Sequence, residues 1–147
     1  MIAHLIYARS RLGFPIRYFP EGVPKLWSHV GVYIPEKAQV WEARMGHRFG
    51  PTPLIEFMDR YRHMEIVNFE VPDLNSGMCW LEENRGKPYG MLTVIGMALG
   101  LANGENSGDH CSEAAENFLH ACGLRRWRSD LHRISPNRSH HNIGGVQ

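Results

Sequence analysis

A cysteine stands at the start of an amphipathic pattern in the segment GDHCSEAAENFL, residues 108–119. The apolar residues recur at helical spacing, which predicts a helix over about 110–122 that ends at Gly123. We expect Asp109 to cap this helix, so that the positive end of the helix dipole lowers the pKa of the Cys111 thiol. A thiolate there is a nucleophile, and the N–H groups of the first turn could hold an oxyanion.

A structural role is the alternative for this cysteine. Buried cysteines commonly act as small hydrophobic residues, and Cys111 and Cys122 would then be the two ends of the buried stripe of the helix. Glu113 and Glu116 would also oppose a thiolate if their carboxylates pointed at it. A catalytic interpretation therefore requires a base and an orienting group elsewhere in the chain.

The segment SHVGVYIPEKAQVWEA predicts a β-hairpin that supplies both groups. If Ile34 pairs with Gln39, His29 and Glu42 become diagonal neighbours on one face of the sheet. Glu42 could then accept a hydrogen bond from one imidazole nitrogen and leave the other as a base. A slip of one residue would send Glu42 to the opposite face, and His47 is a second candidate partner for His29.

The remaining pattern predicts a single domain over residues 1–147, with a loose C-terminal tail from about residue 135. Further strands are expected at Ile2–Tyr7 and Met64–Val71, and further helices over 53–61, 74–84 and 91–102.

The composition of the chain bears on whether it binds nucleic acid, is secreted or spans a membrane. The chain has 147 residues, of which 43% are hydrophobic and 21% charged, and its net charge of +1 gives no reason to expect a nucleic-acid partner. The apolar run Met1–Ala8 is too short for a signal peptide, and Met91–Ala102 is too short for a transmembrane helix. We therefore expect a protein that is cytoplasmic as synthesised, with no transmembrane segment.

Cysteine and histidine spacing predicts neither disulfides nor a metal site. The odd total of 3 cysteines suits free thiols in a reducing compartment. A zinc site would have to combine His29, His110 and Cys111, or use His140 and His141 of the tail. Neither set matches a standard ligand spacing, so no metal and no cofactor are expected.

Four motifs in a fixed order resemble a known family. WSHVGVYI, VWEA, KPYG and HCSEAAENFL are similar to the circularly permuted branch of the NlpC/P60 cysteine peptidases, the YiiX-like papain-fold proteins. In the ordinary branch the cysteine helix precedes the histidine strand, whereas here the histidine strand comes first. The opening IYARSRLGFPIRYF is similar to small phage- and prophage-encoded members. The resemblance runs from about Ile2 to Gly123.

The resemblance implies a fold and an activity. The fold would be α+β and papain-like, with the cysteine helix packed against a small antiparallel sheet. Cys111 matches the nucleophile, His29 the base and Glu42 the third, polar member of the triad. The implied reaction is hydrolysis of an amide bond through an acyl-enzyme, with peptidoglycan stem peptides as substrate. Action at the cell wall would follow lysis, or the protein would be a virion component.

Three further residues are expected to border the oxyanion site or the substrate. Tyr89 of KPYG matches a family tyrosine ahead of the cysteine helix, although a loop aromatic that packs on the core explains it equally well. Ser112 would act locally at the helix start. His110 would either hydrogen-bond near the thiolate or fill space.

Two other functions remain open. The family includes lipid-directed members, so an acyltransferase or thioesterase is the alternative enzyme, favoured if Leu92, Ile95 and Met97 line an apolar groove. A phage interaction module that keeps the fold without turnover is the non-catalytic alternative. The oligomeric state is left open.

Overall fold

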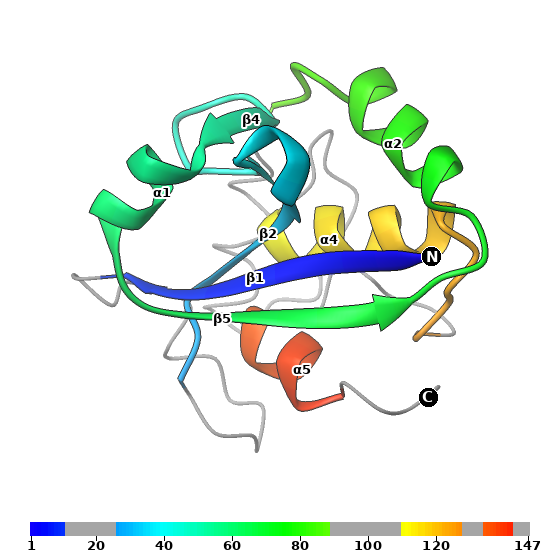
Figure 1. Ribbon diagram of the computed structural model, residues 1–147. Coiled ribbons are helices and arrows are strands. Elements are labelled where there is room, and N and C mark those ends of the chain that lie inside the picture. Colours follow the sequence, from blue (N-terminus) through cyan, green and yellow to red (C-terminus); the bar gives the residue numbers. More distant parts are fainter. Residues whose placement is uncertain (11–25, 89–109, 128–133, 143–147) are drawn as a thin grey trace.

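The computed structural model describes residues 1–10, 26–88, 110–127 and 134–142 (Figure 1). Its centre is a five-stranded sheet in the order β4-β3-β2-β1-β5. Every neighbouring pair of strands is antiparallel. The strands are β1 (Ile2–Ser10), β2 (His29–Ile34), β3 (Gln39–Glu42), β4 (Gly50–Pro53) and β5 (Tyr61–Glu70).

The described helices complete an α+β fold, as predicted. They are α1 (Leu54–Arg60), α2 (Leu74–Glu83), α4 (Cys111–Ala121) and α5 (Pro136–His141), and a short 3-10 turn covers Pro35–Lys37 between β2 and β3. α4 packs on β2 and on α2, whereas α1 packs beside β4 and β5. Among the described residues, no helix combines the length and the apolar character that crossing a bilayer demands.

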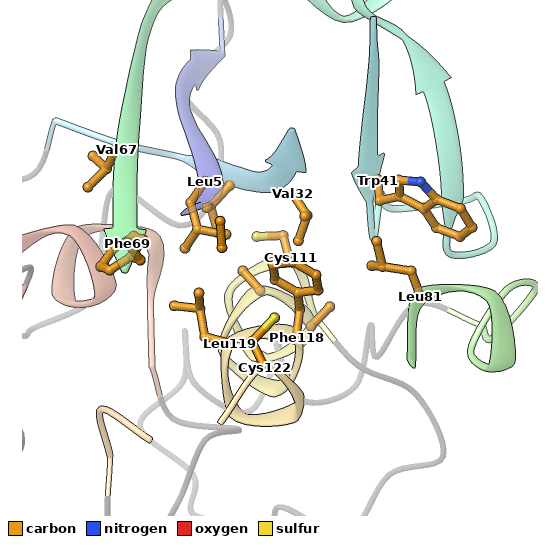
Figure 2. Close-up of a cluster of buried hydrophobic side chains, with 14 of the residues drawn as sticks. Leu5, Val32, Trp41, Val67, Phe69, Leu81, Cys111, Phe118, Leu119 and Cys122 are labelled. Carbon is orange, nitrogen blue, oxygen red and sulfur yellow. The ribbon is translucent and has the colours of Figure 1, made fainter. Parts of the chain in front are cut away.

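The main core lies between the sheet and α4. Figure 2 shows Cys111, Phe118 and Leu119 on the side of α4 that faces Leu5 and Val32 of the sheet. Burying a side chain of this size contributes roughly 1.5–3 kcal/mol, so the apolar stripe read from the sequence is what fixes α4 to the sheet. A smaller cluster on the other face joins α1 to the sheet through Ile6, Ala8, Val40 and Phe57.

α4 ends as its sequence predicts. Gly123 has a φ of +85°, a left-handed conformation that a glycine adopts without strain. The N–H of Gly123 donates to the carbonyl of His120 at 2.9 Å, and that of Leu124 donates to the carbonyl of Leu119 at 2.9 Å. These two bonds form a Schellman motif and satisfy carbonyls that the end of the helix would otherwise leave without partners.

The structure differs from the sequence interpretation at the edge strand of the sheet and in the C-terminal segment. β4, with the sequence GPTP, was not expected because proline interrupts a sheet ladder, but it lies at the edge of the sheet, where proline is tolerated. The prediction of a loose tail from residue 135 is wrong for residues 135–142. Ser135 caps α5, whose residues Pro136, Asn137 and Ser139 are buried. The predicted helix over 91–102 lies outside the described residues.

Candidate functional site

The β2–β3 hairpin brings His29 and Glu42 together as predicted. Ile34 pairs with Gln39, and this register makes His29 and Glu42 diagonal neighbours. His29 Nε2 lies 2.8 Å from Glu42 Oε2, and both side chains are buried. Gly31 lets the two strands pack this closely, because a Cβ at that position would lie 2.5 Å from Val40 Cγ1 and 2.9 Å from the carbonyl oxygen of Trp41.

Both carboxylate oxygens of Glu42 take part in hydrogen bonds. Oε2 contacts His29, while Oε1 accepts hydrogen bonds from Thr52 Oγ1 at 2.7 Å and from Arg60 Nη2. Burial alone would raise the pKa of Glu42. The hydrogen bond and charge of His29 lower that pKa instead, assisted by Thr52 and Arg60, from 4.5 to about 2. Glu42 is therefore a fixed negative charge at any pH near neutrality.

Two residues of the site were not expected from the sequence. The ring of Tyr61 stacks on the imidazole of His29, with centroids 5.2 Å apart and planes 7° apart. The ring of Phe57, on α1, lies 6.0 Å from the same imidazole. These contacts restrict the rotation of the imidazole, which belongs to the first residue of β2.

Cys111 is the first residue of α4, and its helix is capped differently from the prediction. The N-cap is His110, not Asp109; residue 109 lies outside the described residues. His110 Nδ1 accepts the N–H of Glu113 at 3.3 Å. The N–H groups of Cys111 and Ser112 belong to the first turn and have no acceptor within the helix. N–H groups of this kind at a helix start can donate to an anion.

The thiol of Cys111 and the imidazole of His29 influence each other strongly. Burial alone would raise the pKa of Cys111, which is 2% exposed. The charge of His29 and hydrogen bonds to His110 and His29 lower that pKa from 9.0 to about 6.

The imidazole responds in the opposite sense. Burial alone would lower the pKa of His29. The negative charge of the Cys111 thiolate instead raises the pKa of His29 well above 6.5, and hydrogen bonds to Cys111 and to Glu42 act in the same direction. Since Nε2 contacts Glu42, Nδ1 is the ring nitrogen left for the sulfur. Between about pH 6 and the raised pKa of His29, the favoured state is a thiolate beside an imidazolium.

His110 combines two roles at the helix start. Because a backbone N–H can only donate, Nδ1 of the capping His110 must be the acceptor, and a neutral ring then carries its proton on Nε2. The Oγ of Ser112 lies 3.1 Å from the same Nδ1, and its proton is donated to the carbonyl of Ile134. The buried His110 thus fills space and supports the thiolate, and Ser112 connects the helix start to the C-terminal segment.

Replacing His110 separates its capping role from its effect on the thiol. His110→Ala loses the cap and is expected to lower the free energy of unfolding by about 1 kcal/mol, whereas His110→Asn keeps a side-chain acceptor at the N-cap. Both variants lose the hydrogen bond to Cys111, so both should raise its pKa above about 6. Urea denaturation and the pH dependence of Cys111 alkylation measure the two effects. An unchanged titration in both variants would contradict the role at the thiol.

The other residues considered for the site either have different partners or lie outside the described residues. Tyr89 lies outside the described residues, as do Leu92, Ile95 and Met97. His47 is exposed in the turn after β3 and is not the partner of His29. The two α4 carboxylates that could oppose a thiolate have other partners, Arg126 for Glu116 and the His110 ring, at 3.9 Å, for Glu113.

The remaining cysteines differ from Cys111. Cys79 is exposed, and Cys122 is buried with its pKa raised to about 11, because burial penalises the thiolate and the charge of Asp73 adds to that penalty. Within the described parts of the chain, no group of three or more His, Cys, Asp or Glu side chains is arranged to hold a metal ion.

Compared with protein-family models, with curated proteins and with solved structures, the chain gives no match.

Proposed function

We propose that the protein is a cysteine hydrolase that cleaves an amide bond with Cys111, His29 and Glu42. One observation carries the proposal. A thiol at a helix N-terminus has its pKa lowered to about 6 by an imidazole whose other nitrogen is held by a buried carboxylate. A core cysteine needs neither the helix start nor the ion pair, whereas a nucleophile uses both.

The geometry supports the following reaction. The thiolate of Cys111 attacks the carbonyl carbon of the substrate, and the carbonyl π electrons move to oxygen. N–H groups at the start of α4 stabilise this oxyanion. His29 then gives its proton to the leaving amine as the C–N bond breaks, which leaves a thioester on Cys111. Neutral His29 takes a proton from water, the resulting hydroxide attacks the thioester, and the acid and the thiolate are released.

The proposed fold is a permuted NlpC/P60-like papain fold, and peptidoglycan stem peptides are the proposed substrate. The order of elements supports the fold, since the histidine strand β2 precedes the cysteine helix α4. The substrate rests on the resemblance of the sequence motifs alone, because a fold does not fix a substrate.

Digestion of purified peptidoglycan tests this function. Wild type should release fragments with new peptide amino termini, read by mass spectrometry, and Cys111→Ala should reduce the rate by at least about 10³-fold. Release by Cys111→Ala at the wild-type rate would overturn the proposal. Turnover of an acyl thioester by wild type, without peptide cleavage, would replace peptide hydrolysis with the lipid-directed alternative.

A further inference from the structure

The C-terminal segment Ile134–Asn142 contacts the chain just before the base. Asn137 of α5 is 3% exposed. Its Oδ1 accepts the N–H of Trp27 at 2.6 Å, and its Nδ2 donates to the carbonyl of Trp27 at 2.8 Å. One amide side chain thus satisfies both backbone groups of a buried residue that lies two positions before His29.

The same segment contacts the helix of the nucleophile. Ser112 Oγ, next to Cys111, donates to the carbonyl of Ile134. Ser139 Oγ donates to Glu116 Oε1 at 2.6 Å, one turn further along α4. α5 packs beside α4. The segment therefore connects the start of α4 to the entry of β2, two regions far apart in the sequence.

Trp27 lies just before the residues of β2 that pair with β1. The pairing of β2 with β1 ends at His29, opposite Ala8, and Ser28 adds one backbone bond to Ala8 at 3.0 Å. The side chain of Asn137 thus provides the two backbone hydrogen bonds that a neighbouring strand would otherwise provide to Trp27. This bond pair fixes the backbone of Trp27, two residues before His29.

We propose that Asn137 is a positioning residue that sets His29 against Cys111 through its two hydrogen bonds to the backbone of Trp27. This inference rests on the proposed function, since it concerns the same thiol and imidazole. Misplacement of reacting groups by about 1 Å can cost roughly 10² in rate, so a residue with no contact to substrate can still control the reaction.

The test compares two variants of the same short helix. Asn137→Ala loses both bonds to Trp27, whereas Ser139→Ala loses buried bonds to Tyr7 and Glu116 but leaves Trp27 bound. We expect Asn137→Ala to raise the midpoint of Cys111 alkylation by about one pH unit and to slow peptide hydrolysis by at least about 10-fold. Ser139→Ala should lower the urea midpoint while the alkylation midpoint stays at the wild-type value.

The outcomes separate this proposal from the function on which it rests. Suppose that Asn137→Ala loses as much stability as Ser139→Ala and keeps the wild-type alkylation midpoint. Asn137 would then only stabilise the fold, and the proposal would be overturned. If Asn137→Ala does not fold, Asn137→Asp keeps the acceptor for the Trp27 N–H and should give an intermediate midpoint. A wild-type thiol with an ordinary midpoint would instead contradict the proposed function, whatever the variants do.

Discussion

Alkylation of Cys111 by iodoacetamide should follow a titration centred near pH 6, and His29→Ala should move that titration toward 9.0, the usual value for a thiol. The physical reason is that the imidazolium charge compensates the cost of a buried thiolate, and without it burial favours the neutral thiol. At neutral pH the thiolate fraction would fall from most of the molecules to about one in a hundred, so the rate should drop by about 10- to 100-fold.

Peptide mass spectrometry after alkylation over a range of pH measures this titration for each cysteine. The absolute rate at Cys111 is a poor guide, because the side chain is only 2% exposed, but the midpoint does not depend on access. Cys122, buried with a pKa of about 11, should remain unlabelled through neutrality and is the internal control. A midpoint near 9.0 in wild type, or no change in His29→Ala, would contradict an activated thiolate.

Hydrolysis should depend on pH differently from alkylation. Both require the thiolate, so both should rise through about pH 6. Hydrolysis also requires the proton of His29 for the leaving amine, so it should fall again above the raised pKa of that imidazole. Alkylation needs no such proton and should stay level or rise. Divergence of the two profiles on the alkaline side is therefore a signature of His29 as the acid.

Local patterns in the sequence were sufficient for the parts of the site that lie within one hairpin or one helix. The alternation of apolar residues and the length of the PEKA turn fix the β2–β3 register, and that register decides that His29 meets Glu42. The apolar stripe likewise fixes which side of α4 is buried. The meeting of Cys111 with His29 was inferred from family resemblance, because no local rule relates residues so far apart.

The contacts that the sequence did not predict depend on non-local strand pairing and on buried polar groups. Tyr61 reaches His29 only because β1 pairs with both β2 and β5, a register that no local pattern encodes. The polar composition after residue 134 indicated a loose tail, but Asn137 and Ser139 are buried with their hydrogen bonds satisfied. One signal was available: a serine followed by proline at 135–136 is typical of a helix start.

Glu42→Gln should be the most damaging change that preserves shape. The amide loses the negative charge that holds both the imidazolium of His29 and the guanidinium of Arg60. Removing one partner of a buried ion pair typically costs about 3–5 kcal/mol, and we expect a loss of that order in the free energy of unfolding. Hydrolysis should fall by about 10²- to 10⁴-fold, because the imidazole loses both its orientation and its stabilising charge.

The pH dependence of stability gives this prediction a second test. The folded pKa of Glu42 is lowered from 4.5 to about 2, so the folded state binds fewer protons between these values and stability rises with pH there. The contribution, about 3 kcal/mol, is complete above the unfolded pKa and is lost as the pH falls toward the folded one. In urea titrations the gap between wild type and Glu42→Gln should therefore shrink on acidification from neutral pH.

A compensating variant separates stability from catalysis at Glu42. Adding Arg60→Met to Glu42→Gln removes the guanidinium that the single change leaves without a carboxylate, so much of the lost stability should return. Activity should not return, because His29 still lacks its negative partner. If the single variant hydrolysed substrate at the wild-type rate, Glu42 would be a structural carboxylate, and the base would be oriented by its ring contacts with Tyr61 and Phe57.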